Sequence, residues 1–228
     1  MSDHFYKDIL YPLQDKVLSQ VAKNETPFYL TGGTALSRFM LNHRYSDDLD
    51  FFANRVTNFS SHVITFHKNL EGHFEKVVIE NTQESYARIM VYTSNAELKI
   101  ELVSDVGFRV GLPDVSASGF KIDTWGNILS NKLTALQRKA GKDFVDILHI
   151  CLNYQFNWET IVDYAKQKDA WINEIRVSEY LNGFNPQQLN EVKFSKDFDP
   201  FRIKEDFFKV IARDSLHGFN NSLYGTKL

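Results

Sequence analysis

Hydrophobic residues in the first half of the chain follow helical and extended patterns in turn. Apolar side chains spaced three and four residues apart predict helices over residues 5–23, 34–43 and 59–74. Patterns rich in β-branched and aromatic residues predict extended segments over residues 27–31, 48–53, 75–81, 86–93 and 97–105. This order of elements predicts a mixed-sheet domain with flanking helices.

The second half of the chain is almost wholly helical in its pattern. Helical spacing predicts helices over residues 124–140, 143–154, 157–168, about 173–183 and about 200–217. A cluster of glycine, proline and serine at residues 110–120 is typical of a loop near a domain boundary. We therefore predict an α+β protein with a sheet domain at residues 1–123 and a helical bundle at residues 124–228.

Composition narrows the class of protein but assigns no chemistry. The chain has 228 residues, of which 43% are hydrophobic, so it can bury a substantial core. Its net charge of −3 gives no overall positive field, so any contact with nucleic acid must rest on local clusters of Lys and Arg. The single cysteine, Cys151, forms no intramolecular disulfide, and no apolar run approaches the roughly 20 residues that span a bilayer. We expect a cytoplasmic protein without a membrane segment.

The candidate chemistry begins with an Asp-Leu-Asp sequence in front of two phenylalanines. Strand side chains alternate between faces, so Asp48 and Asp50 project to one side while Leu49 and Phe51 enter the core. Glu101 is the expected third carboxylate, from the alternating segment at residues 97–105, and Asp105 is the reserve candidate. Three carboxylates on one site are the arrangement that holds Mg²⁺ for phosphoryl or nucleotidyl transfer. A solvated strand face or a calcium-binding surface is the alternative.

A double glycine lies upstream of these carboxylates, between a predicted strand and a predicted helix. Gly32 and Gly33 let the backbone approach a phosphate, and Thr34 can add a hydroxyl group. The plain alternative is a tight turn without a ligand.

These motifs together resemble the AbiEii/AbiGii-type toxins, a nucleotidyltransferase family of the polymerase-β-like superfamily. The stretch "GGTALSRFMLNHRYSDDLDFF" is similar to the Gly-Gly turn and Asp-x-Asp of the superfamily, and Arg44, Ser46, Asp48 and Asp50 match the "R-x-S-x-D-x-D" form of the toxins. A later block, "KLTALQRKAGKDFVDIL", resembles a second family motif. The matches cover about residues 29–54 and 98–150.

The resemblance implies roles for individual residues. The implied metal ligands are Asp48, Asp50 and Glu101, and the implied ion is Mg²⁺, with Mn²⁺ as a substitute. The implied nucleotide-binding residues are Gly32, Gly33, Thr34, Arg44, Ser46 and Lys132. Asp143 would complete the catalytic set. Two positions depart from the common pattern, because Glu101 and Lys142 stand where relatives usually have Asp and Arg.

Several of these positions have a structural alternative. Arg44 can pair with Asp47 instead of a phosphate. Lys132 and Lys139 lie seven residues apart on one predicted helix face, which can be a solvated face. Gly141 is expected to break the helix, and Asp143 can then be an N-cap without a catalytic role.

The resulting hypothesis is a metal-dependent nucleotidyltransferase that moves a nucleoside monophosphate from an NTP to an acceptor hydroxyl. The resemblance implies that the acceptor is RNA, such as a tRNA end, or a protein, with the helical domain contributing to the nucleotide and acceptor cleft. It also implies a toxin with a separately encoded antitoxin. The alternatives are a small-molecule transferase of the antibiotic-modifying kind and a non-catalytic nucleotide-binding module.

Overall fold

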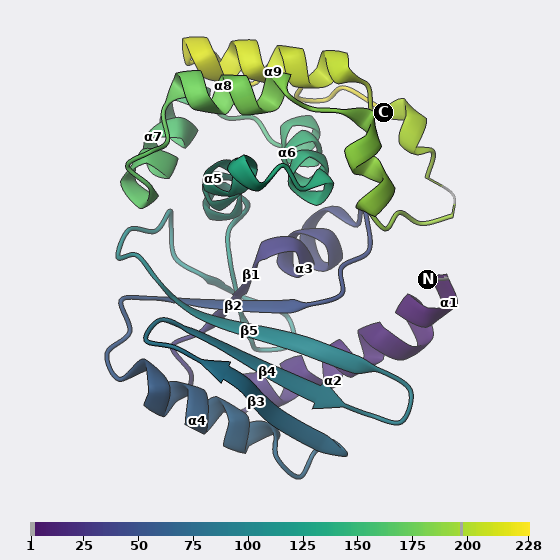
Figure 1. Cartoon of the computed structure of the whole chain (residues 1–228), viewed down its shortest axis with the longest axis vertical. Helices are drawn as coiled ribbons and strands as arrows, with labels where there is room; N and C mark the ends of the chain where they lie inside the picture. The colour runs from purple at the N-terminus through teal and green to yellow at the C-terminus, as the bar shows by residue number, and fades with distance from the viewer. Residues whose placement is uncertain (1–2, 197) are drawn as a thin grey trace. The chain divides into compact units, whose positions relative to one another are not determined.

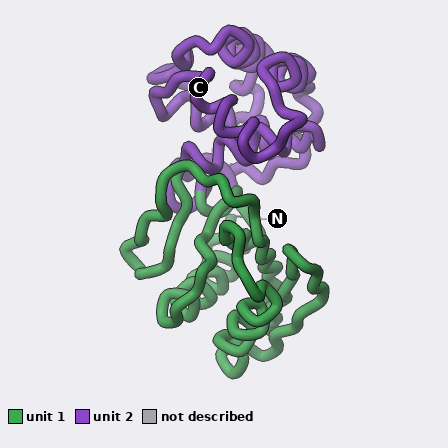
Figure 2. The backbone as a smooth tube through the Cα atoms, turned by 90° about the vertical axis from the view of Figure 1, so that its left-hand side faces the viewer, with its two compact units in different colours: residues 1–35, 46–124 green, residues 36–45, 125–228 purple. Residues whose placement is uncertain are grey.

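The computed structural model describes residues 3–196 and 198–228, and it divides the chain into two compact units. Residues 1–35 and 46–124 form unit 1, and residues 36–45 and 125–228 form unit 2 (Figure 2). The junction at residues 124 and 125 lies beside the predicted domain boundary. Residues 36–45 belong to unit 2, whereas the sequence analysis assigned them to the first domain.

Unit 1 is built on a seven-stranded mixed sheet in the order β3-β4-β5-β2-β1-β7-β6. The strands are β1 (Tyr29–Thr31), β2 (Leu49–Asn54), β3 (Lys76–Thr82), β4 (Tyr86–Tyr92), β5 (Glu97–Asp105), β6 (Asp114–Val115) and β7 (Lys121–Ile122). The pairs β2–β5 and β1–β7 are parallel, and the others are antiparallel. The short strands β6 and β7 were not predicted, because two-residue strands carry no periodicity.

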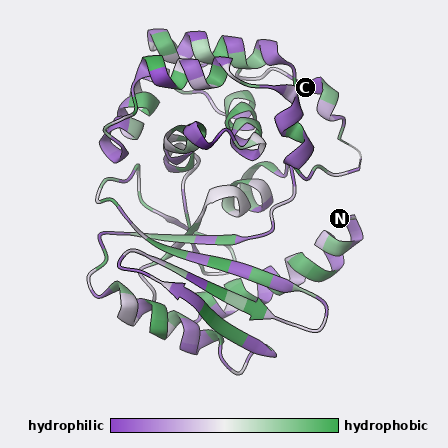
Figure 3. Cartoon of the chain, viewed as in Figure 1, coloured by the Kyte–Doolittle hydropathy of each residue, from purple (hydrophilic) through white to green (hydrophobic). Residues whose placement is uncertain are grey.

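Helices cover one face of this sheet. The N-terminal helical segments are α1 (Asp3–Phe5), the π-helical η1 (Tyr6–Leu10) and α2 (Tyr11–Ala22), and α4 (Phe59–Leu70) follows β2. Figure 1 shows α2 and α4 on the same side of the strands. Phe51 of β2 points to that side, since its ring packs 5.3 Å from the ring of Phe66 in α4. Hydrophobic and hydrophilic residues alternate along the strands (Figure 3), so the opposite face is the more polar one.

The double glycine opens a short helix. Gly32 begins α3 (Gly32–Leu36), which continues as the π-helical η2 (Ser37–Leu41). Asn42 ends it in a left-handed conformation with φ of 50°. The helix predicted over residues 34–43 is therefore present, shifted by about two residues.

Unit 2 is helical, which together with the mixed sheet confirms the α+β class. Its elements are α5 (Trp125–Ala135), η3 (Leu136–Arg138), α6 (Gly141–Asn153), α7 (Trp158–Lys168), α8 (Glu174–Asn182), η4 (Pro186–Glu191), η5 (Pro200–Arg202) and α9 (Glu205–His217). Aromatic rings fill much of the core, with Phe208 lying 4.0 Å from Phe184 and 5.6 Å from Phe144 between ring centroids. Within residues 3–196 and 198–228, no helix combines the length and apolar character needed to cross a membrane.

The junction between α5 and α6 differs from the prediction. The helix expected over residues 124–140 ends as the 3₁₀ turn η3, and Lys139 takes a left-handed φ of 53°. Gly141 begins α6 instead of breaking a helix, and its N-cap is Ala140. Asp143 is thus the third residue of α6 and not an N-cap. A Cβ on Gly141 would lie 2.0 Å from the carbonyl oxygen of Gln188, so this start requires glycine.

Candidate active site

Two of the predicted carboxylates are direct neighbours in the sheet. Asp50 of β2 lies opposite Glu101 of β5 in the parallel register. Laterally paired residues project to the same face, and Phe51 points to the helix-covered face. Asp50 and Glu101 therefore share the polar face of unit 1, as the alternation pattern predicts.

Lys99 links the third carboxylate to this pair. Its Nζ lies 3.0 Å from Oδ2 of Asp48 and 3.3 Å from Oε1 of Glu101. Although burial opposes it, these two ion pairs raise the pKa of Lys99. A charged ammonium group thus holds Asp48, which directly precedes β2, beside Glu101.

Glu101 is also held by two residues of the neighbouring strand β4. Tyr86 donates its hydroxyl to Oε1 of Glu101 at 2.8 Å, and Nη2 of Arg88 lies 3.2 Å from the same oxygen. Burial works to raise the pKa of Glu101, but the hydrogen bond from Tyr86 and the contacts with Lys99 and Arg88 outweigh it and lower that pKa. Glu101 is therefore ionised at neutral pH, with one oxygen fixed by three donors.

The reserve candidate, Asp105, is the last residue of β5. It pairs with Asn54, four residues beyond the pairing of Asp50 with Glu101. Four residues of strand span about 13 Å. Of the two candidates, Glu101 is the one that lies beside Asp50.

Gly32 approaches the same carboxylates through its backbone. Its φ is +67°, and a Cβ placed on it would lie 2.5 Å from Oδ2 of Asp50. The left-handed conformation and the close approach both exclude larger residues. The double-glycine turn is thus fitted against the side chain of Asp50.

Thr34 and Ser46 stabilise the segment that precedes the Asp-Leu-Asp sequence. The buried hydroxyl of Thr34 donates to the backbone carbonyl of Asp48, and the Thr34 and Ser46 hydroxyl oxygens lie 2.9 Å apart. These contacts position the backbone of Asp48. The nucleotide-binding roles implied for Gly33, Thr34 and Ser46 stay predictions.

The second motif forms a buried ion-pair cluster inside unit 2. Nζ of Lys132 lies 2.7 Å from Oδ1 of Asp143 and 2.6 Å from Oδ2 of Asp146. Arg44 binds Asp146 through two nitrogens, Nε at 2.7 Å and Nη2 at 2.8 Å. Nε2 of His43 lies 2.8 Å from Oδ1 of Asp146. The structure therefore pairs Arg44 with Asp146, a partner that the sequence analysis did not name.

The cluster continues to the surface through Arg138, which binds both oxygens of Asp143 at 2.7 and 3.0 Å. Burial opposes ionisation of both carboxyl groups, but Lys132 with Arg138 lowers the pKa of Asp143, and Arg44 with Lys132 lowers that of Asp146 well below its usual value. Lys132 is 6% exposed, so the solvated-face alternative does not describe it.

The carboxylate site of unit 1 has the donor chemistry of a magnesium site. Carboxylate oxygens are the ligands that Mg²⁺ prefers. Over the described part of the chain, no three carboxylate, imidazole or thiol groups already converge on one metal position. The Lys99 ammonium group is instead the cation between Asp48 and Glu101. Asp48 and Glu101 thus already bind one cation between them, and their oxygens are of the kind that a divalent cation binds.

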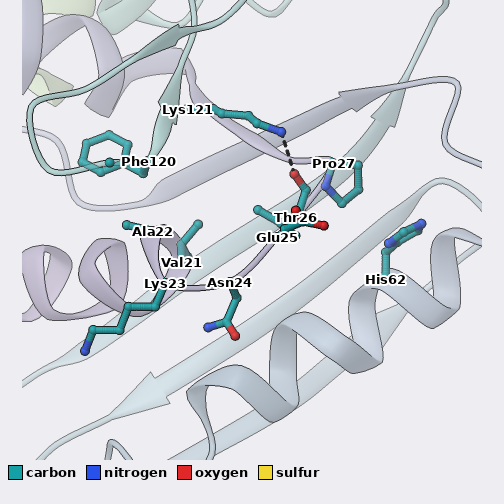
Figure 4. A pocket seen from close by; sticks show the side chains of 11 residues that line it. Val21, Ala22, Lys23, Asn24, Glu25, Thr26, Pro27, His62, Phe120 and Lys121 are labelled. Carbon is teal, nitrogen blue, oxygen red and sulfur yellow. Dashed lines mark hydrogen bonds between the residues drawn. The ribbon is translucent and has the colours of Figure 1, made fainter.

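A pocket elsewhere in unit 1 contains none of these carboxylates. It has a volume of about 710 Å³ and lies among the end of α2, the following residues 23–27, and Phe120 with Lys121 (Figure 4). Lys121 spans one side by donating from Nζ to the carbonyl oxygen of Thr26 at 2.9 Å. Among the described residues, Glu25 is the one carboxylate in its lining, so we place the candidate site at Asp48, Asp50 and Glu101.

Several residues that hold these groups were not predicted from the sequence. Lys99 lies two residues before Glu101 in the alternating segment at residues 97–105, and this spacing was the available signal. Tyr86 and Arg88 required the register between β4 and β5, and Asp146 required the packing of residues 36–45 in unit 2. These depend on long-range pairing, which periodicity does not encode.

Comparison with known proteins adds a family and two structural neighbours. The family described as "Nucleotidyl transferase AbiEii toxin, Type IV TA system" matches residues 16–219. The structure is similar to the crystal structure of JHP933 from Helicobacter pylori, with a TM-score of 0.60, 19% identity, and coverage of 95% of this chain and 94% of that one. It is equally similar to a provisionally assigned nucleotidyltransferase of H. pylori, with a TM-score of 0.60, 19% identity, and coverage of 95% and 96%. At 19% identity, these two structures support a similar fold and nothing more specific. No curated protein matches the chain.

Proposed function

Because this chain belongs to the AbiEii nucleotidyl transferase toxin family, we propose that it transfers a nucleoside monophosphate from an NTP to an acceptor hydroxyl in a metal-dependent reaction. The observation that supports this most directly is the lateral pairing of Asp50 with Glu101, to which Lys99 joins Asp48. The three carboxylates share one face beside Gly32.

In the proposed reaction the acceptor oxygen forms a bond to the α-phosphorus of the NTP. The bond from the α-phosphorus to the oxygen that bridges to the β-phosphorus breaks, and pyrophosphate leaves. Mg²⁺, or Mn²⁺ in its place, held by Asp48, Asp50 and Glu101, would supply positive charge to the triphosphate and to the acceptor oxygen. The proton of the acceptor hydroxyl passes to Glu101 or to water.

The contacts of Glu101 support its part in this proposal. Tyr86 and Arg88 of β4 both contact Oε1, so the orientation of the carboxylate is fixed. We assign Oε2 as the oxygen that faces the acceptor. Fixing a group in its reactive orientation before the substrate arrives removes part of the entropic cost of the reaction.

For the residues of unit 2 we keep the roles that the family implies as proposals. Lys132 would contribute positive charge to nucleotide binding, and Asp143 would complete the catalytic set. Their 2.7 Å ion pair supports a joint role. Lys132→Met should then weaken NTP binding in a titration, whereas Lys139→Met, at the exposed turn after η3, should leave it unchanged.

The biological setting proposed from the family is a type IV toxin–antitoxin system with a cognate antitoxin protein. The acceptor is proposed to be RNA, such as a tRNA end, or a protein side chain.

The test is to incubate the purified chain with each labelled NTP, Mg²⁺, total RNA and total protein, and to follow the label. Asp50→Asn and Glu101→Gln should reduce labelling by at least 100-fold, a typical loss for an essential catalytic group, while Asp105→Asn retains it. Labelling of a small molecule instead would redirect the proposal to the antibiotic-modifying class. Undiminished labelling by Asp50→Asn would refute the site.

A further inference from the structure

We propose that the Lys99 ammonium group is a built-in counter-ion of the carboxylate site, which a divalent cation must displace in order to bind. The inference rests on the proposed function and adds a regulatory step to the same site. In the resting chain, Lys99 would occupy the oxygens that the metal needs.

The contacts show that the lysine and a metal would compete for the same atoms. Nζ of Lys99 contacts Oδ2 of Asp48 at 3.0 Å and Oε1 of Glu101 at 3.3 Å. These carboxylates are two of the three proposed ligands. An ammonium group and a directly bound metal ion cannot both occupy the space between them, and like charges at this separation repel.

The charges explain why the resting site attracts this lysine. Asp48, Asp50 and Glu101 place three negative charges near one another where β2 pairs with β5, and Lys99 together with Arg88 offsets part of their mutual repulsion. Lys99 reaches them because it lies on β5 two residues before Glu101, on the same face. The ion pairs keep the carboxylates together before any metal arrives.

Neighbouring contacts allow the lysine to leave without loss of the site. Tyr86 and Arg88 still hold Glu101 from β4, and Thr34 still holds the backbone of Asp48. The Lys99 side chain is 29% exposed, so its ammonium group has a route to solvent. The exchange therefore needs only a rotamer change of one long side chain.

The first experiment measures Mn²⁺ binding to the full chain by calorimetry without nucleotide. Lys99→Met removes the charge but keeps the length of the side chain, and we expect it to bind Mn²⁺ about tenfold more tightly than the parent. Lys99→Arg should bind no more tightly than the parent, because a guanidinium group grips carboxylates in a bidentate manner. Lys76→Met is the matched control, because Lys76 lies on β3 over the Tyr92 ring, and it should leave the affinity unchanged.

A second readout uses the unmodified chain. Adding Mn²⁺ should increase several-fold the labelling of the Lys99 amine by an acylating reagent, measured by mass spectrometry, with Lys76 as the internal reference. Labelling that is independent of Mn²⁺ overturns the inference, as does a Lys99→Met chain that binds Mn²⁺ no more tightly than the parent.

Asp50→Asn separates this inference from the proposed function. Suppose that Asp50→Asn abolishes Mn²⁺ binding while Lys99→Met does not tighten it and Mn²⁺ does not increase acylation of Lys99. That result would support the metal site and refute the counter-ion role. If the parent binds no Mn²⁺, or Asp50→Asn binds it as the parent does, the proposed metal site itself fails.

Discussion

At the scale of single residues, Gly32 ties the conformation of a turn to the position of a carboxylate. Its positive φ is one reason for glycine, and the 2.5 Å that would separate a Cβ from Asp50 is a second, independent reason. Here a side chain would both strain the backbone and push aside a proposed metal ligand.

Gly32→Ala should therefore lower both stability and activity. We expect a loss of about 1–2 kcal/mol in the free energy of unfolding from the positive φ, and at least a tenfold loss of nucleotidyl transfer from the displaced Asp50. Urea titration and the labelling assay measure the two effects.

Gly72→Ala is the control for this experiment, because Gly72 has φ of +78° and nothing within 4 Å of an added Cβ. Gly72→Ala should lower the free energy of unfolding by the same amount, because its φ is also positive, and should keep full activity. Equal activity of the two variants would mean that Asp50 tolerates the crowding, or that its position does not matter for catalysis.

At the scale of elements, α6 carries the buried ion pairs of unit 2 on its first two turns. Asp143 and Asp146 are both 0% exposed, and each is paired with two or more basic groups. Burying a carboxylate is tolerated only when such partners compensate for lost hydration. The helix is thus held to residues 36–45 by charge as well as by apolar packing.

Asp146→Asn should strongly destabilise the chain, because it removes the carboxylate that binds Arg44 through two nitrogens and one of the two carboxylates that bind Lys132. The expected loss is about 3–5 kcal/mol, measured by urea unfolding. Asp206→Asn, which breaks the exposed pair with Lys209, should give no measurable change. An Asp146→Asn chain as stable as the parent would show that the cluster is better hydrated than the structure indicates.

The histidine on α6 predicts a dependence of stability on pH. Burial, followed by the nearby His43 and Arg44 and opposed by Asp146, lowers the pKa of His149 from 6.5 to about 3. Between those values the unfolded chain binds a proton on His149 and the folded chain does not, so stability is full above pH 6.5 and falls as the pH drops.

The slope from His149 should approach about 1.4 kcal/mol per pH unit well below pH 6.5. His149→Phe keeps an aromatic ring against His43 and Phe198 and should flatten the loss of stability between pH 7 and pH 5. His73→Phe, at an exposed position, should leave the slope as it is in the parent. The opposite pattern would assign the pH dependence to other groups.

Elements were also the scale at which the sequence was most informative. Alternation was sufficient to predict β2, β4 and β5 and the face of Asp50, and the helix that follows β1 was predicted, although it begins at Gly32 and not after the double glycine. The pairing of β2 with β5 and the contact of Arg44 with Asp146 were not predictable, because each joins segments far apart in the chain. The junction after α5 failed for a local reason, since the left-handed Lys139 has no propensity signal.

At the scale of the whole molecule, the chain enters unit 2 twice. It contributes residues 36–45, returns to unit 1 for residues 46–124, and re-enters unit 2 at residue 125. The predicted cut after residue 123 would therefore leave the helical unit without His43 and Arg44.

A fragment of residues 125–228 should consequently fail to unfold cooperatively on heating, as followed by circular dichroism. Without Arg44, Asp146 would be buried with too little compensation. Joining residues 36–45 to the fragment through a flexible linker should restore a cooperative transition. A fragment that melts cooperatively without them would show that the apolar core suffices.

The double entry into unit 2 also sets an order of events during synthesis. Arg44 emerges from the ribosome 102 residues before Asp146, its partner in the finished protein. At about 5–20 residues per second, this interval lasts roughly 5–20 s. During that time residues 36–45 of the nascent chain lack the helices of unit 2 that pack against them. Proteases and chaperones therefore have access to this segment until those helices are synthesised.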